Sequence, residues 1–135
     1  LLLEPVMESY PLKVPLVFGA AGKVVAVMQP HRYSRLHSLF PDFCKAFNDA
    51  DTVIVAPVYP AGEAPIPGAD AKSLARAIRA RGRNEPVVVN KVADLVSVLP
   101  DILKDGDLLL MMGAGSIGAI SQQIAEHGFE EVGQA

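Results

Sequence analysis

Short apolar runs recur along the chain from residue 24 onward, each bounded by polar or turn-forming residues. The runs lie at 24–28, 52–56, 86–89 and 107–112. Each is too short for a typical helix and is rich in aliphatic residues, which favours buried β-strands. Continuous rather than alternating apolar runs are typical of parallel strands that are covered on both faces.

The intervals between these runs carry the apolar spacing of helices. The first predicted helix spans about residues 35–48, and five apolar residues share one of its faces: Leu36, Leu39, Phe40, Phe43 and Phe47. Because proline disrupts a helix interior, Pro41 indicates either a separate turn before it or a kink.

Three further helices are expected along the chain. One begins after Asp70 as N-cap, runs to Arg81 and stops at Gly82. Its buried stripe is predicted to contain Leu74, Ala77 and Ile78. The next spans about residues 92–99, is capped by Asn90, and either ends at Pro100 or opens a further turn there through Leu103. The last begins near Ser116 and turns three isoleucines inward: Ile117, Ile120 and Ile124.

Alternating strands and helices imply crossover connections, so we expect a Rossmann-like α/β fold with a mainly parallel sheet and helices on both faces. A chain of 135 residues is long enough for one domain with a real core. Residues 1–22 contain three prolines and no sustained period, which predicts an irregular segment with at most a short edge strand around 14–17.

Composition narrows the classes of partner. Half of the residues are hydrophobic and 20% are charged, as in folded proteins, and the net charge of −3 does not suggest a nucleic-acid partner. The clustered arginines fit one helix face and its exit loop: Arg76, Arg79, Arg81 and Arg83. No apolar run reaches the roughly 18–20 residues of a membrane span, and no signal-peptide pattern opens the chain. We therefore expect a soluble cytoplasmic domain with no membrane partner.

The chain contains one cysteine, Cys44, within an apolar helical pattern. No charged activator adjoins it in the sequence, so a buried structural thiol is a better interpretation than a nucleophile. A single cysteine excludes an intrachain disulfide and fits a reducing compartment.

The most informative polar stretch is QPHRYSR at 29–35, directly after the first buried run. In open parallel sheets, ligands bind at the carboxyl ends of the strands. The guanidinium groups of Arg32 and Arg35 could grip a carboxylate or phosphate through paired hydrogen bonds. Ser34 is expected to cap the following helix. From these residues alone, anion binding and surface decoration both remain open.

Two further motifs follow strands. GAGSIG at 113–118 matches the G-x-G-x-x-G dinucleotide pattern, but it follows the last strand, so a tight turn is favoured over NAD binding. A third possibility is that the backbone amides at the start of the following helix face an anion. The stretch VYPAGEAPIPGAD at 58–70 contains Tyr59 and Glu63 and predicts either an ordered loop at the sheet edge or an ordinary crossover loop. No Walker A motif occurs, so any phosphate-gripping machinery for ATP would lie elsewhere.

Taken in order and spacing, these three motifs resemble the C-terminal domain of the Mur ligase family, in those members that join L-alanine to UDP-N-acetylmuramate. The resemblance covers about residues 22–126. It implies a role in an ATP-dependent, amide-forming ligase of peptidoglycan synthesis and cell wall biogenesis. The implied partners are an N-terminal domain that binds the UDP-sugar and a central ATPase domain with the P-loop and magnesium site.

The resemblance also implies roles for particular residues. His31, Arg32 and Arg35 would hold the L-alanine carboxylate or the negative charge near an acyl phosphate, and which arginine meets which group stays open. Tyr59 and Glu63 would shape the neighbouring loop of the substrate site. A nucleotide-proximal loop would comprise Gly113, Ala114 and Gly115. The full enzyme would use ATP and Mg, whereas this domain alone would bind neither of them, hold no metal, contain no complete catalytic set and be inactive.

Family members open this domain with Asp-Asp-Tyr-Gly-His-His-Pro and a helix, and residues 1–22 contain nothing similar. We therefore predict a divergent segment at 1–22 and the Mur ligase C-terminal domain at 23–135. The alternatives are the C-terminal domain of a murein tripeptide ligase, a non-catalytic module that binds small anions or nucleotides, and a domain that only packs on its neighbours.

Overall fold

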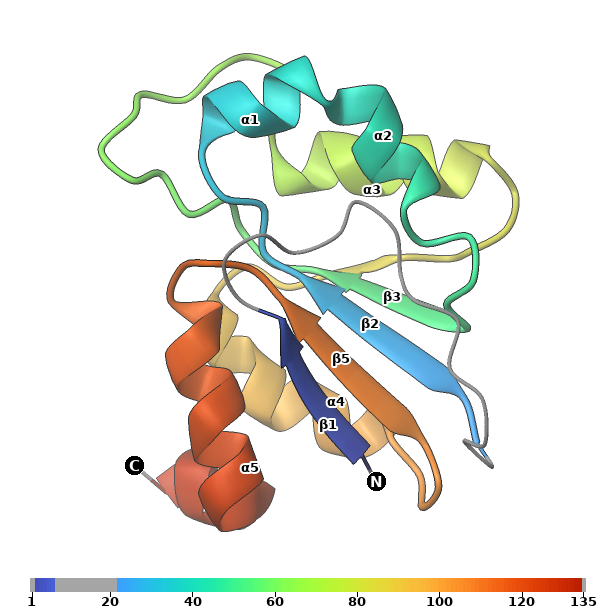
Figure 1. The fold of residues 1–135 in the computed structure, drawn as a ribbon, viewed down its shortest axis with the longest axis vertical. Helices are drawn as coiled ribbons and strands as arrows, with labels where there is room; N and C mark the ends of the chain where they lie inside the picture. Colours follow the sequence, from blue (N-terminus) through green and yellow to red (C-terminus); the bar gives the residue numbers. More distant parts are fainter. Residues whose placement is uncertain (1, 7–21, 135) are drawn as a thin grey trace.

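A parallel sheet of five strands, covered by helices on both faces, forms the framework of the molecule (Figure 1). The computed structural model describes residues 2–6 and 22–134. The strands, in chain order, are β1 (Leu2–Val6), β2 (Val24–Met28), β3 (Thr52–Val55), β4 (Val87–Val88) and β5 (Leu108–Met112). Their order in the sheet is β1-β5-β2-β3-β4. The expected α/β class with a parallel sheet is confirmed.

The four predicted strands all form, although β3, β4 and β5 are shorter than their apolar runs. Each residue of β5 is buried, because β5 lies between β1 and β2 within the sheet and helices cover its faces. This burial explains why the sequence there, LLLMM, does not alternate.

The direction of chain progression reverses between β2 and β5. From β2 the chain adds β3 and then β4 on one side, whereas β5 pairs with the other side of β2. The register runs from Val24 beside Leu108 to Met28 beside Met112, so the two strands end level with each other. In open parallel sheets, the crevice beyond such a reversal is where ligands bind.

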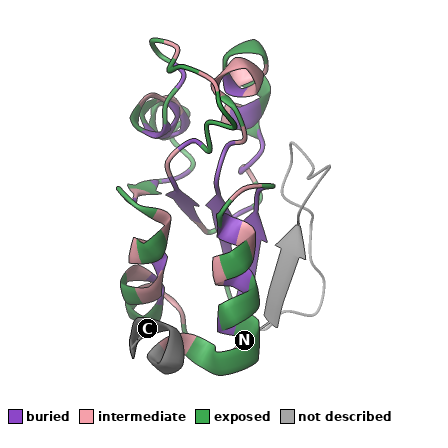
Figure 2. Cartoon of the chain, turned by 90° about the vertical axis from the view of Figure 1, so that its left-hand side faces the viewer, coloured by how far each residue is buried: buried purple, intermediate pink, exposed green. Residues whose placement is uncertain are grey.

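The described residues also form five α-helices and one 3-10 turn, all of which connect strands except the last helix, which follows β5. They are α1 (Tyr33–Ser38), α2 (Phe40–Lys45), α3 (Ala71–Ala80), η1 (Val92–Asp94), α4 (Leu95–Ile102) and α5 (Ile117–Gln134). Figure 1 shows α1, α2 and α3 on one face of the sheet and α4 and α5 on the other. Each face has its own apolar core, centred on Phe43, Phe47 and Leu74 on the first and on Leu95, Leu99 and Ile117 on the second. Figure 2 shows the buried strands between helices whose outer surfaces are exposed.

The helical segment after β2 is two short helices rather than one. Helix α1 ends at Ser38, and α2 begins at Phe40, which places Pro41 in its first turn, where a missing N–H costs nothing. The predicted apolar face is confirmed: Leu36, Phe43 and Phe47 are fully buried, and Leu39 and Phe40 pack against the same core.

Helix α3 follows its prediction closely. The Asp70 carboxylate accepts a hydrogen bond from the Ser73 N–H at 2.7 Å, and Gly82 takes a φ of +79° just beyond the helix. The buried stripe contains Ala75 with Leu74 and Ile78, whereas the predicted Ala77 is only partly buried. The predicted burial of Ala77 is therefore wrong, and Ala75, two positions earlier, is buried instead.

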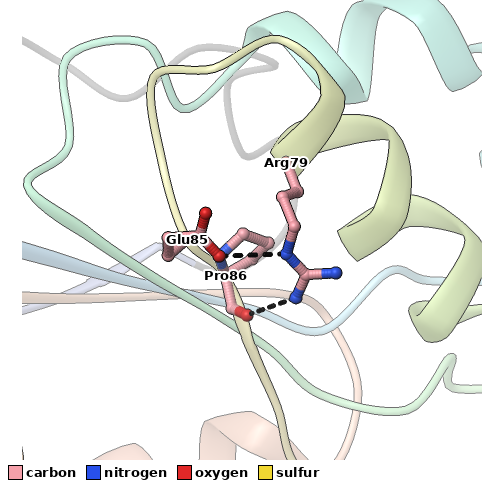
Figure 3. Close-up of polar contacts among 3 residues, drawn as sticks. All are labelled: Arg79, Glu85 and Pro86. Atoms are coloured by element: carbon pink, nitrogen blue, oxygen red, sulfur yellow. Dashed lines mark hydrogen bonds and ion pairs between the residues drawn. The ribbon is translucent and has the colours of Figure 1, made fainter.

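The end of α3 is tied to the start of β4 by Arg79 (Figure 3). Its Nε donates to the Glu85 carboxylate at 3.0 Å, and its Nη2 donates to the Pro86 carbonyl at 3.5 Å. Both charged side chains are more than half exposed, so this ion pair contributes little to stability. Nearby, Arg81 donates to Asn48 at 3.3 Å. Two of the clustered arginines, Arg79 and Arg81, thus make contacts within the folded domain.

The helix predicted at 92–99 begins differently from the prediction, whereas at its other end the predicted further turn through Leu103 is confirmed. Asn90 does not cap it: η1 starts after Lys91, and α4 starts only at Leu95. Pro100 does not end the helix, which continues to Ile102, and Leu103 N–H still donates to the Leu99 carbonyl at 2.9 Å. In α5, Ile117 and Ile124 are buried as predicted, and Ile120 packs partly against the same core.

Strand β1 was not predicted. Its glutamate and proline obscured the apolar pattern, yet residues 2–6 pair in parallel with β5 at the edge of the sheet, where proline is tolerated. The possible strand around 14–17 lies outside the described residues. Cys44 is half-buried against the first core, and burial raises the pKa of its thiol, which agrees with a structural role.

At the amino ends of β2 and β5, Asp107 joins the two strands. Its carboxylate accepts from the Lys23 N–H and the Lys104 N–H, each at 2.9 Å. These two bonds are the main reason that the pKa of Asp107 is lowered. Among the described residues, no helix is both long and apolar enough to cross a membrane.

Replacing Asp70 by alanine is expected to lower the free energy of unfolding by about 1 kcal/mol, because the first turn of α3 loses its cap. Urea unfolding measures this change. Asp70→Asn retains an acceptor oxygen and should remain close to the parent chain. Equal stability of the alanine variant would show that the cap contributes nothing.

Candidate ligand site at the carboxyl edge

Three segments meet beyond the carboxyl ends of β2, β3 and β5. The segment after β2 and the loop after β3 join through a parallel bridge between His31 and Tyr59. Tyr59 N–H donates to the Pro30 carbonyl and Arg32 N–H donates to the Tyr59 carbonyl, both at 2.8 Å. The two rings stack with centroids 5.5 Å apart and planes 13° apart. His31 and Tyr59, both predicted as site residues, therefore form one surface.

The glycine-rich turn after β5 packs against this surface. A Cβ atom on Gly115 would lie 2.5 Å from Cγ and 2.7 Å from Cβ of Tyr59, so only glycine allows the turn to approach so closely. Gly113 has a φ of +151°, and a Cβ there would lie 2.8 Å from the carbonyl oxygen of Gln29. Ala114, between them, is exposed. The predicted loop of Gly113, Ala114 and Gly115 thus borders the same site.

Gln29 is the first residue of the QPHRYSR motif, and no role was predicted for it from the sequence. Its side chain is buried, with Oε1 accepting from the Ile117 N–H at 2.9 Å and Nε2 donating to Ser116 Oγ at 3.1 Å. Because this contact occupies the Ile117 amide, that amide is not open to a bound anion. The geometry agrees with the tight-turn interpretation of GAGSIG.

Glu63 holds the beginning of α1 from the loop after β3. Its carboxylate accepts from the Ser34 N–H at 3.0 Å and from the Ser34 hydroxyl at 2.6 Å. The predicted capping role of Ser34 is therefore wrong: Arg32 occupies the N-cap position without a side-chain bond, and Glu63 acts as the acceptor instead. The bonds from Ser34, together with the nearby Arg32 charge, lower the pKa of Glu63.

Arg32 has an unusual backbone conformation, with φ of +69° and ψ of 138°. For a residue with a Cβ this conformation costs on the order of 1–3 kcal/mol, and such strain concentrates at functional sites. The Arg32 side chain is exposed at the edge of the sheet, whereas Arg35, one turn further along α1, is half-buried and engaged with its neighbours. Their predicted roles toward a ligand remain predictions.

A cavity of about 340 Å³ adjoins this edge above the ends of β3 and β4. Its wall includes Tyr33 from α1, Val58 from the loop after β3, Lys72 from α3 and Asn90 after β4. It is displaced from the reversal between β2 and β5, where His31, Tyr59 and the turn at 113–115 meet. We therefore place the candidate site at the reversal, with the cavity beside it.

A doubly wound parallel sheet with helices on both faces defines a Rossmann-like α/β domain, a class in which ligands bind at the reversal point of the sheet. Residues 5–115 match the family described as Mur ligase, glutamate ligase domain, and the chain belongs to that family. The resemblance inferred from the three motifs is thereby confirmed.

Proteins similar to this chain are named UDP-N-acetylmuramate–L-alanine ligase. The chain is 56% identical over 126 residues to a UDP-N-acetylmuramate–L-alanine ligase of Xylella fastidiosa, covering 89% of this chain and 26% of that protein. It is 54% identical over 132 residues to the ligase of that name from Stenotrophomonas maltophilia, covering 93% and 28%. The crystal structure of UDP-N-acetylmuramate-alanine ligase MurC from Thermotoga maritima matches with a TM-score of 0.57 and 28% identity, over 77% of this chain and 20% of that one. The chain thus spans about a quarter of the length of these relatives.

The clamp of Glu63 on α1 predicts a pH-dependent stability. Because the pKa of Glu63 is lowered in the folded chain, its ionised form stabilises the fold above its ordinary pKa, and this contribution disappears as the pH falls through the folded-state pKa. We expect Glu63→Gln to be less stable than the parent at neutral pH, and the difference should shrink as the pH falls below the ordinary pKa of a glutamate and through the lowered pKa of the folded state.

Urea unfolding at stepped pH values measures this difference. Glu85→Gln is the matched control, because Glu85 is an exposed carboxylate in a surface ion pair. A difference between Glu63→Gln and the parent that does not change with pH would contradict the clamp.

The contact of Gly115 with Tyr59 predicts a coupled pair. Gly115→Ala should lower the free energy of unfolding by about 1–3 kcal/mol, since the new methyl group overlaps the tyrosine. In a Tyr59→Gly background the same change should cost much less, because Cβ, Cγ and Cδ2 of the tyrosine, the three atoms that would overlap, are all gone. Urea unfolding of the four chains gives the coupling, and additive effects would refute the contact.

Proposed function

We propose that this chain is the C-terminal domain of an ATP-dependent ligase that joins L-alanine to UDP-N-acetylmuramate. The main support is the identity of 54–56%, over most of the chain, to relatives named for that reaction. Since the chain spans about a quarter of their length, the domains that bind the UDP-sugar and ATP would lie in the rest of the protein.

The site suits the part of this reaction that handles negative charge. An amino acid brings a carboxylate, and the activated sugar would carry an acyl phosphate. Guanidinium groups bind both through paired, charge-assisted hydrogen bonds. Arg32 lies exposed at the edge, beside the stacked rings of His31 and Tyr59. We assign to these residues and Arg35 the binding and orientation of the amino acid against the activated carboxyl group.

ATP and Mg would be held by the central domain of the full enzyme. In this chain the Ile117 amide at the glycine-rich turn is already bonded to Gln29, which argues against a phosphate cradle there. The contribution of the domain would be to bring cationic side chains to the nucleotide-facing edge and to help exclude water. A cytoplasmic location agrees with the free thiol of Cys44.

Replacing Arg32 or Arg35 by alanine in the full-length ligase tests the proposal. Loss of a charge-assisted bond to the carboxylate should raise the KM for L-alanine by about 10- to 100-fold with kcat nearly retained. At position 32, alanine keeps the Cβ and hence the backbone strain, so the comparison isolates the guanidinium. Steady-state kinetics at saturating ATP measures both constants.

Arg76→Ala provides the matched control, since Arg76 is an exposed arginine on α3. It should leave both constants unchanged. A fall in kcat at constant KM would move the arginines to the charge of the transition state, and unchanged constants would remove them from the site. Absence of L-alanine ligation by the unmodified full-length protein would refute the proposed function itself.

A further inference from the structure

Gln29 spans the reversal point of the sheet. It follows β2 directly, its N–H donates to the Met112 carbonyl at the end of β5 at 2.9 Å, and its side chain reaches Ser116 and Ile117 beyond that strand. The residue is 3% exposed. One side chain therefore joins the carboxyl end of β2 to the beginning of α5.

The orientation of the Gln29 amide is determined by its partners. The Ile117 N–H can only donate, so it must face Oε1, and Nε2 is then directed to Ser116 Oγ. Both polar ends of the side chain are thus engaged inside the protein. Since unmade hydrogen bonds of a buried amide are costly, the side chain holds the turn at 113–116 in one position.

The position of that turn is transmitted to the candidate site through direct contacts. Gly113 lies against the backbone and Cβ of Gln29, and Gly115 lies against the side chain of Tyr59. Tyr59 in turn is hydrogen-bonded to Pro30 and Arg32 and stacks on His31. The turn cannot move away from Gln29 without leaving Tyr59 unsupported on one side.

We propose that Gln29 is a positioning residue, which fixes the turn at 113–116 against Tyr59 and so sets the geometry in which the cationic edge binds the carboxylate of the amino acid. It acts through the turn and need not touch the ligand. This inference rests on the proposed function, because it concerns the same site.

The test is Gln29→Met in the full-length ligase, with the KM for L-alanine and kcat measured at saturating ATP and sugar nucleotide. Methionine keeps the length of the side chain but makes neither hydrogen bond. We expect KM to rise about tenfold while kcat stays within about threefold, because the site is assembled with a displaced turn. Gln122→Met is the control: Gln122 is exposed on α5 and its side chain donates to the exposed Glu126, so both constants should be unchanged.

A purely structural role predicts something different. Partial unfolding would reduce the amount of active enzyme and lower the apparent kcat at constant KM, and this result would overturn the proposal, as would unchanged constants. If the methionine variant is insoluble, Gln29→Asn replaces it in the test. Because the shorter amide must draw the turn inward to keep its hydrogen bonds, KM should again rise. An unchanged KM would overturn the inference. If the unmodified full-length protein shows no ligase activity, the proposed function is refuted. This result differs from a failure of the inference about Gln29, which is seen only when the unmodified enzyme is active.

Discussion

The pairing of β2 with β5 is the constraint on which the rest of the molecule depends. Its partners are separated by most of the described chain, from Val24 beside Leu108 to Met28 beside Met112. Parallel pairing requires the intervening chain to cross over the sheet, and the helices that do so bury both of its faces. The central strands β2 and β5 must therefore be apolar throughout, and the polar residues of the candidate site follow the ends of the strands.

Those ends are held differently. At the amino ends, carboxylates accept backbone amides: Asp107 bonds to Lys23 N–H, and Asp51 bonds to Val24 N–H at 2.7 Å. At the carboxyl ends the neutral amide of Gln29 performs the corresponding function. The same task, joining neighbouring strands beyond their ends, is thus performed by charged side chains at one end of the sheet and by an uncharged one at the other.

How much the sequence predicts depends on the range of the interactions involved. The four apolar strands and the cap at Asp70 follow from local pattern and were found. The capping of α1 by Glu63 was missed because its partner, Ser34, is 29 residues away. Gln29 was missed for the same reason, and β1 because its edge position tolerates a glutamate and a proline. Long-range polar partners leave no periodic signal in a sequence.

The wide separation of Gln29 and Ile117, 88 residues apart, also has a consequence for folding. Contacts between distant parts of a chain form slowly, because closing the loop costs entropy before any contact rewards it. The bridge at the reversal point can form only after the crossover helices have brought β5 beside β2. The candidate site should therefore be among the last parts of the domain to form, so that partly folded chains lack the assembled arrangement of Gln29, the turn at 113–116 and Tyr59.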